Sequence, residues 1–376
     1  MARLGVGLIG TGFMGKTHAL AWRNVKAVMG DAGASVAVPH LALLCDTPDR
    51  AAGVAAQFGF DRATSDWKAL CADPAVDVVS ITTPNGLHHE MALEALRNGK
   101  HVWCEKPMAL TLAQAEDMAA AAKVAGKVTM VGYNYLRNPA YTHARKLIHE
   151  GVIGRVVQFR GWVDEDYQAD PDLEWSWRAK LADAGLGALG DIGSHLVSLA
   201  RGLVGEVESL IAEMQTIHET RPLPGGAGRA AVENEDAASV ILRFAGGVQG
   251  SMVISRSAWG RKSRLGFEVH GTKGMVIYDQ ERMNELQLYV NEGDKAVQGF
   301  KTILTGPAHP PYGAFCPAPG HQLGFNELKV IECAALMRAI AGETADMDFA
   351  EALKIERVIH AIAESARAGG ARVSLQ

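Results

Sequence analysis

Cysteine is scarce in this sequence, with five residues in a chain of 376. The five are scattered, odd in number and free of C-x-x-C spacing, which is typical of reduced thiols and disfavours a disulfide framework or a zinc site. The 13 histidines include no H-E-x-x-H or comparable cluster, so we expect no metal. Reduced thiols also favour a cytoplasmic protein. The cysteines are Cys45, Cys71, Cys104, Cys316 and Cys333.

A strong charge of one sign is also missing. Lysine and arginine total 37 against 42 acidic residues, and the net charge of -5 gives no reason to expect nucleic acid or an anionic membrane as a partner. No apolar run approaches the roughly 20 residues that span a bilayer. Arg3 precedes an apolar stretch, as in a signal peptide, but glycines interrupt that stretch and we reject this interpretation.

Glycine, in contrast, is concentrated near the N-terminus in a G-x-G-x-x-G motif. The apolar residues 4–9 read as one buried strand, and a helical pattern follows the motif. In this context Gly10 makes a tight turn, Gly12 lets the backbone approach a pyrophosphate, and Gly15 lets the helix pack on the strand. A glycine turn without a ligand is the alternative. The predicted cofactor loop is Gly10, Thr11, Gly12, Phe13, Met14 and Gly15.

A second buried strand, residues 40–45, ends at Asp46. An acidic residue there can accept hydrogen bonds from the ribose hydroxyls, and its charge repels the 2′-phosphate of NADP. We therefore expect NAD, and NADP is the less favoured alternative that Arg50 leaves open because its side chain could reach a phosphate. Asp46 lies further past the glycines than usual, which fits a long surface loop through residues 30–33. Asp46 could also cap a helix over residues 50–58.

Two further strand ends deliver polar residues to the same crevice. The strand 76–83 is followed by residues 84–88, and the strand 101–104 is followed by Glu105, Lys106 and a proline. Lys106 suits a cation that faces the substrate, although a plain surface lysine is the common case. Helices at 91–98 and 112–125 and a strand at 128–131 complete the alternation of strand and helix, which predicts a doubly wound parallel sheet.

The chain is long enough for two domains, and 48% hydrophobic residues supply their cores. We expect a dinucleotide-binding Rossmann domain over residues 1–131 and an α+β domain over 132–376 for substrate binding and oligomerisation. The second should contain a large, mostly antiparallel open sheet, because turn signals separate neighbouring strands. Its predicted elements are a helix at 140–150 and strands at 156–163, 207–214, 237–244, 248–255, 264–270 and 275–278.

A polar pair and two loops in the second half are candidates for the substrate site. Asp191 and His195 are four residues apart on a predicted helix, which suits an imidazole base oriented by a carboxylate; an N-capping aspartate is the alternative. Residues 162–178 mix aromatics and acids as a sugar site would, or form a solvated acidic loop over core tryptophans. The turn-rich residues 306–321 could form a lid, a surface excursion or an oligomer contact.

Five motifs together resemble those of the Gfo/Idh/MocA oxidoreductases, the family of glucose-fructose oxidoreductase and inositol dehydrogenase. They are GTGFMG at 10–15, TPNGLHHE at 83–90, EKP at 105–107, YNYLRNP at 133–139 and GDIGSH at 190–195. The resemblance covers nearly the whole chain. Residues 281–287 and 299–313 are also similar to the levoglucosan dehydrogenase branch of the family, which borders the inositol dehydrogenases.

The resemblance implies roles for individual residues. Lys106, Asp191 and His195 match the catalytic lysine, aspartate and histidine, and a cis peptide bond is expected before Pro107. Besides the loop residues, Asp46 and Arg50, the implied cofactor contacts are Thr83, Pro84, Asn85, His88, Glu105, Lys106 and Asn134. The implied substrate contacts are Lys106, Tyr133, Trp162, Asp164, Arg178, Asp191, His195 and His309.

These features predict an NAD-dependent dehydrogenase that oxidises a secondary hydroxyl of a cyclic polyol or sugar, such as an anhydrosugar, an inositol or an aldose. The resemblance further implies a homodimer or homotetramer that assembles through the C-terminal sheet. Two alternatives stay open. One is a glycosidase that oxidises its sugar transiently with NAD, and the other is a sugar or NAD sensor that has lost the reaction.

Overall fold

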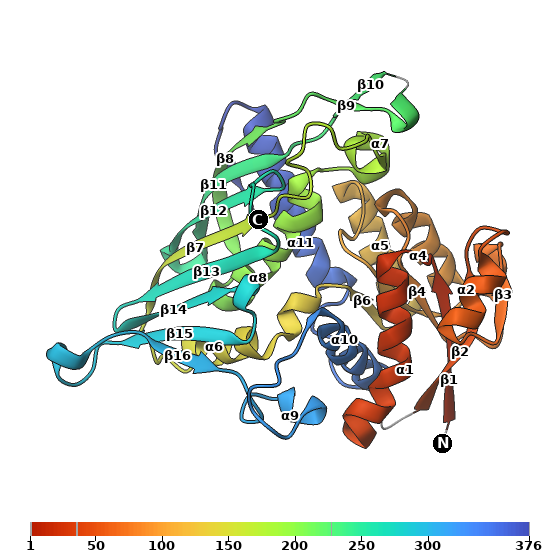
Figure 1. Cartoon of the computed structure of the whole chain (residues 1–376), viewed down its shortest axis with the longest axis horizontal. Coiled ribbons are helices and arrows are strands. Elements are labelled where there is room, and N and C mark those ends of the chain that lie inside the picture. The colour runs from red at the N-terminus through yellow and green to blue at the C-terminus, as the bar shows by residue number, and fades with distance from the viewer. Residues whose placement is uncertain (1, 35–36, 227, 376) are drawn as a thin grey trace. The chain divides into compact units, whose positions relative to one another are not determined.

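The chain forms two compact units that do not follow a single boundary. The computed structural model describes residues 2–34, 37–226 and 228–375 (Figure 1). The first unit comprises the chain up to Arg137 together with Leu323–Glu356, and the second comprises Asn138–Gln322 together with the residues from Arg357 onward. This differs from one division at residue 131, because a late segment of the chain packs with the first unit.

The first unit is built on a parallel sheet with strand order β3-β2-β1-β4-β5-β6. This arrangement confirms the predicted doubly wound sheet. All four residues of β4 are buried, as expected for a central parallel strand. The strands are β1 (Ala2–Ile9), β2 (Ala37–Cys45), β3 (Arg62–Thr64), β4 (Val78–Ile81), β5 (His101–Cys104) and β6 (Thr129–Val131).

Helices connect these strands, and their caps are local. Asp66 accepts hydrogen bonds from two backbone N–H groups at the start of α3, and Thr111 accepts one at the start of α5. The predicted loop at 30–33 is wrong, because the first helix continues to Ala34 with a break at Gly30 (φ 58°). The helices are α1 (Phe13–Ala34), α2 (Ala51–Phe58), α3 (Trp67–Ala72), α4 (His88–Arg97), α5 (Leu112–Ala125), α10 (Phe325–Ile340) and the first part of α11 (Phe349–Arg367).

The second unit contains a nine-stranded sheet with order β16-β15-β14-β13-β7-β12-β11-β8-β17. Within the described residues, β7 and β12 are its one parallel pair, so the predicted, mostly antiparallel sheet is confirmed. The strands are β7 (Val156–Asp164), β8 (Val207–Gln215), β11 (Ala237–Phe244), β12 (Gln249–Ser255), β13 (Arg264–Gly271), β14 (Gly274–Asp279), β15 (Glu285–Val290), β16 (Lys301–Leu304) and β17 (Val373–Ser374), with a separate pair β9 (Thr220–Pro222) and β10 (Arg229–Ala231).

One face of this large sheet is covered by helices. Phe159, Gly161 and Val163 of β7 are buried on that face, and a Cβ at Gly161 would lie 2.7 Å from the Leu196 side chain of α8. The other face, called here the open face, carries the alternate residues, including Ile241 of β11 and Val253 of β12. The helices of this unit are α6 (Pro139–His149), α7 (Leu181–Ala184), α8 (Ser194–Val204), α9 (Tyr312–Phe315) and the rest of α11; a π-helical turn, η4 (Leu189–Gly193), precedes α8.

Candidate active site

The glycine loop after β1 has the shape that a pyrophosphate needs. Gly10 has a φ of 91°, which favours glycine. A Cβ at Gly15 would lie 2.2 Å from the Gly10 carbonyl oxygen, so the close contact between loop and helix also requires glycine. At Gly12, by contrast, no atom lies within 4 Å of an added Cβ. The loop therefore leaves open space beside the N-terminus of α1, where backbone N–H groups favour an anion.

Asp46 at the end of β2 is hydrogen-bonded to this loop. Thr11 donates its hydroxyl proton to Asp46 Oδ2 and accepts a bond from Arg50 Nη2 at 3.1 Å. The Arg50 Nη2 atom also lies 3.9 Å from Asp46 Oδ2. Asp46 does not cap α2, since that helix begins at Ala51 after Arg50 without a side-chain cap. The three side chains that sequence reasoning linked to the cofactor thus form one contact group at the sheet edge.

The loop after β4 is tied to the peptide that carries Lys106. Burial lowers the pKa of His88. Its ring lies between two carbonyl oxygens, with Nδ1 2.9 Å from Pro107 O and Nε2 3.0 Å from Thr83 O. The Lys106–Pro107 peptide bond is cis, as the family resemblance implies. Pro84 and Asn85 open the short turn η1 (Asn85–Leu87) between these contacts.

Glu105 is held in a buried cluster of charges that sequence reasoning missed. Its Oε1 lies 2.9 Å from His18 Nε2 and 2.5 Å from Lys329 Nζ, and Lys329 also lies 2.7 Å from Glu332 Oε2. Burial opposes ionisation of Glu105, but the charge of Lys329 and the hydrogen bonds from His18 and Lys329 together outweigh burial and keep the pKa of this carboxyl below its usual range. The second Glu105 oxygen accepts a 3.3 Å bond from the Lys106 backbone N–H.

Through this bond the cluster supports the backbone at Lys106. It joins α1, which starts at the glycine loop, to the end of β5 and to α10. Lys329 lies 197 residues beyond Gly132, whose carbonyl oxygen its Nζ approaches to 3.4 Å, and no local pattern connects it to the EKP motif. The signal in the sequence is a lysine and a glutamate three residues apart, Lys329 and Glu332, inside the otherwise apolar stretch 328–337.

Two more residues predicted from the YNYLRNP motif are deeply buried in the first unit. Tyr133 is 1% exposed and Asn134 is 2% exposed, and Asn134 begins the turn η2 (Asn134–Arg137). Tyr135 in that turn packs edge-on against Phe325, and Phe325 stacks on Phe13 with 5.5 Å between ring centroids. The exposed Phe13 of the glycine loop is therefore flanked by an aromatic side chain from α10.

The second unit places Asp191 beside two polar side chains. Asp191 lies in η4, and Ala188 rather than Asp191 occupies the N-cap position, so the capping alternative is wrong. Tyr167 donates a 2.6 Å hydrogen bond to Asp191 Oδ2, and Arg178 Nε lies 3.8 Å from the same oxygen. Burial and the neighbouring carboxylate raise the pKa of Tyr167 well above its usual value, so the phenol stays a donor.

His195 lies in the first turn of α8 and is 7% exposed. The π-helical turn before it was not expected from the sequence, which predicted an ordinary helix through both residues. Such turns insert an extra residue and frequently occur at functional sites. Ser194 donates a 2.9 Å bond to the Gly190 carbonyl oxygen across this turn. Asp191 and His195 thus come from one continuous helical segment of the second unit.

Other predicted substrate contacts lie elsewhere in the second unit. Trp162 and Asp164 alternate with the core residues of β7 and so project from the open face, away from α8. Arg264 covers the Trp162 ring at 4.8 Å and donates a 3.0 Å bond to Asp164. His309 packs edge-on against His143, and its Nδ1 accepts a 3.1 Å bond from the Gly306 N–H. The structure therefore brings Arg178, but not Trp162 or Asp164, to Asp191.

The described ranges contain no group of three histidine, cysteine or acidic residues that could hold a metal ion. Among the same residues, no helix is long and apolar enough to cross a membrane.

Comparison with known proteins identifies the class to which this fold and these residues belong. The model of the oxidoreductase family with an NAD-binding Rossmann fold matches residues 4–133, and the GFO/IDH/MocA C-terminal domain model matches residues 141–277. A levoglucosan dehydrogenase from Pseudarthrobacter phenanthrenivorans is 40% identical, with 97% of each chain covered. The chain therefore belongs to the Gfo/Idh/MocA family of oxidoreductases.

Two further relatives lie within the same class. The inositol 2-dehydrogenase of Rhizobium meliloti is 31% identical over 76% of this chain and 79% of its own. Among solved structures, levoglucosan dehydrogenase in complex with NADH and levoglucosan is 40% identical, covers 99% of both chains and superposes with a TM-score of 0.95. The predicted class, an NAD-dependent oxidoreductase, is confirmed by these family matches.

Proposed function

We propose that the protein oxidises a secondary hydroxyl of levoglucosan or a closely related cyclic polyol, with NAD as the cofactor. The observation that carries the substrate class is the 40% identity to a levoglucosan dehydrogenase along almost the entire chain. The open space at Gly12 and the carboxylate of Asp46 fit the pyrophosphate and the ribose of NAD. When bound, NAD would accept the hydride from the carbon that carries the reacting hydroxyl.

The residues of the chain would supply proton transfer and charge stabilisation. His195 takes the proton of the hydroxyl as general base, a task that suits an imidazole near neutral pH. Asp191 is fixed by Tyr167 and Arg178 and orients His195 or the substrate. Lys106 stabilises the negative charge that develops on the reacting oxygen. Lys106 lies in the first unit and the other two in the second, so this role for all three is part of the proposal.

The experiment that tests this function is absorbance at the NADH band with purified protein. NAD and NADP are supplied in turn against levoglucosan, other anhydrosugars, inositols and common aldoses. We expect turnover with NAD and one of the cyclic polyols. Silence with both cofactors in a protein that still binds NADH would contradict the proposal and favour the sensor. Cleavage of a glycoside without net NADH would favour the glycosidase, which no relative described above supports.

We further propose a homo-oligomer that forms through the open face of the nine-stranded sheet. Ile241 and Val253 lie on this face, and they are 61% and 49% exposed in the single chain. A wide sheet with apolar side chains on its uncovered side is a common protein–protein surface. A cytoplasmic location also stays a prediction; all five cysteines are free thiols, as a reducing compartment would leave them.

A further inference from the structure

The segment Glu233–Asp236 between β10 and β11 places four polar residues in a row, and three of them are buried. Asn234, Glu235 and Asp236 are 3%, 5% and 0% exposed. Burying such groups costs free energy unless each finds a hydrogen-bond partner. None of the four belongs to the catalytic set described above, so their partners indicate what the segment does.

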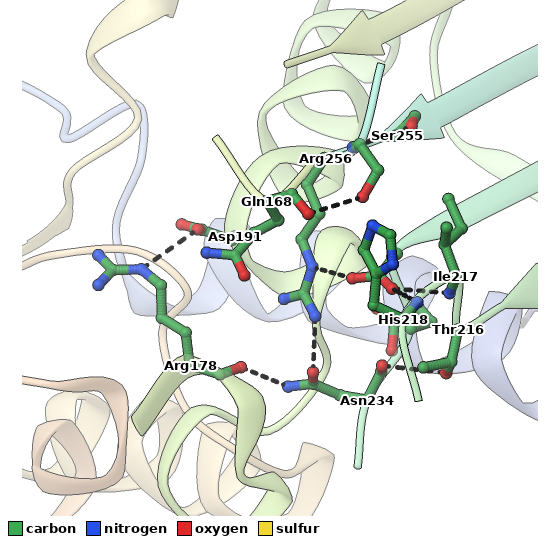
Figure 2. A network of polar contacts seen from close by, with 12 residues as sticks. Gln168, Arg178, Asp191, Thr216, Ile217, His218, Asn234, Ser255 and Arg256 are labelled. Carbon is green, nitrogen blue, oxygen red and sulfur yellow. Dashed lines mark hydrogen bonds and ion pairs between the residues drawn. The ribbon is translucent and has the colours of Figure 1, made fainter. Parts of the chain in front are cut away.

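Three of the four residues bind the chain that leads to Asp191. Glu233 Oε2 accepts a 2.8 Å bond from the Leu181 N–H at the start of α7. Asn234 Nδ2 donates to the Arg178 carbonyl oxygen at 2.9 Å (Figure 2). The same Nδ2 donates to the Gly185 carbonyl oxygen at 3.2 Å.

Glu235 holds the next stretch. Its Oε1 accepts a 2.9 Å bond from the Leu189 N–H at the start of η4, and its carbonyl oxygen accepts one of 2.9 Å from the Ala188 N–H. It thus satisfies backbone donors at an N-terminus whose N-cap residue, Ala188, has no side-chain cap.

The segment is also bound to Arg256, the residue that directly follows β12. Arg256 donates to Asn234 Oδ1 at 2.8 Å (Figure 2). It also donates to Asp236 Oδ1 at 2.8 Å, and the Arg256 and Asp236 side chains are 2% and 0% exposed. The Arg256 carbonyl oxygen also accepts a 3.0 Å bond from the N–H of Gln168, the residue after Tyr167. The anchor therefore reaches both segments that touch Asp191.

We propose that Glu233–Asp236 is a positioning clamp, with Asn234 at its centre, that sets the places of Arg178, η4 and hence Asp191 relative to the sheet. The inference rests on the proposed function in one respect, that Asp191 takes part in catalysis. Within residues 178–189 the clamp contacts backbone atoms only, and it touches no reacting group. Loss of the clamp should lower turnover, because misplacing a catalytic group by about 1 Å can reduce the rate about 100-fold.

The test is Asn234→Asp, which keeps the volume and the acceptor for Arg256 but turns an oxygen toward the carbonyls of Arg178 and Gly185. We expect kcat with levoglucosan and NAD to fall at least tenfold, or about 1.4 kcal/mol, while NADH binding by fluorescence stays within about twofold of the native protein. Hydrogen–deuterium exchange should accelerate in residues 178–195. The matched control is Thr216→Val, which removes the 3.1 Å bond to the Asn234 carbonyl oxygen and leaves residues 178–189 untouched.

A second pair of variants separates positioning from folding. Glu235→Gln keeps an oxygen acceptor for the Leu189 N–H and should retain most activity, whereas Glu235→Leu should lose it. Unchanged kcat in Asn234→Asp, or faster exchange spread over the whole chain, would overturn the clamp. If the native protein turns over no polyol, the proposed function fails instead; the clamp is then decided by exchange in residues 178–195 alone, where no change would refute it.

Discussion

At the scale of single residues, we expect the choice between NAD and NADP to depend on the carboxylate at the end of β2. Asp46 contacts the glycine loop through Thr11, and Arg50, which also bonds Thr11, is a nearby cation that could take a phosphate instead. Asp46→Ala should lower the ratio of kcat/KM with NAD to that with NADP about tenfold to a hundredfold, or about 1.4 to 3 kcal/mol, because the charge that repels a 2′-phosphate is gone.

Steady-state kinetics with NAD and with NADP give this ratio for the native protein and for Asp46→Ala. The exposed Asp49→Ala is measured in parallel as a control. A ratio that does not move in the Asp46 variant would remove this residue as the selector.

Lys106 is expected to act on the reacting oxygen and not on the nucleotide. Lys106→Ala should therefore reduce kcat by about 100-fold or more, as does loss of a preorganised donor, while the Kd of NADH changes little. Steady-state kinetics and NADH fluorescence titration measure the two effects. Lys123→Ala, on the exposed side of α5, is the control. Equal loss of turnover and cofactor binding would show that the lysine serves the cofactor site instead.

Tyr167 gives the site a donor that does not titrate in the working range, since the pKa of its phenol is raised. Tyr167→Phe removes a hydrogen bond to the Asp191 carboxylate; such bonds favour the ionised form, so protonation of the carboxylate should then occur at higher pH. We expect the acid limb of the kcat/KM profile to move to higher pH and kcat to fall at least tenfold, or about 1.4 kcal/mol, because a hydrogen bond to a charged group is worth about 1.5–3 kcal/mol.

The groups that contact this carboxylate from the neighbouring segments are Tyr167 and Arg178, with Glu165 and Arg256 close to the phenol. Tyr289→Phe, which loses a hydrogen bond to Gln298, is the control. A profile of lower height but unchanged shape would mean that Tyr167 only stabilises the fold.

At the scale of elements, the buried cluster of α1, β5 and α10 makes stability depend on pH. Burial lowers the pKa of His18 to about 4, so this ring is neutral in the folded chain and binds a proton readily only after unfolding. The free energy of unfolding should fall between pH 6.5 and pH 4, by up to about 3 kcal/mol from this residue.

Urea denaturation from pH 7 to pH 5 measures this effect. In His18→Gln the fall should be shallower than in the native protein, whereas the exposed His321→Gln should follow the native curve. Identical slopes in all three proteins would exclude His18 as a source of the dependence.

The elements that the sequence revealed are those with local signals. A pattern of a few residues is enough to predict the glycine loop at 10–15, the strand β11 and the turn at 245–247. Helix α10 gave no such signal, because Leu328, Val330 and Ile331 are buried on different sides and erase the periodicity of a surface helix. The short strands β9, β10 and β17 likewise depend on partners distant in sequence.

The candidate site shows the same limit. Lys106, Asp191 and His195 could be named from motifs, yet Lys329 could not be paired with Glu105 before the fold was known, and Tyr167 stood out only as one aromatic among acids. Trp162 was expected at a sugar, but the parity of β7 directs it to the open face. The alternation of residues along a strand can be recognised in the sequence. Which face of the strand packs against the helices is decided by tertiary packing.

At the scale of the whole molecule, the open face is the surface through which we expect copies of the chain to associate. Ile241→Glu places a charge on this face at β11, and we expect it to shift the protein toward the monomer, because burying an unpaired carboxylate at an interface is costly. Light scattering after size-exclusion chromatography measures the mass. Val124→Glu, at an 89% exposed position on α5, is the control. Equal masses for the native protein and both variants would mean that the interface lies elsewhere or that the protein forms no oligomer.

The return of Leu323–Glu356 to the first unit has a consequence for the order in which the protein is made. Glu105 and His18 leave the ribosome early, whereas Lys329, the cation that neutralises their buried cluster, is synthesised more than 200 residues later. Until then a carboxylate that the finished fold buries has no counter-charge and must stay in water. The nucleotide-binding half of the chain, although translated first, is thus completed nearly last, after the sheet of the second unit has emerged.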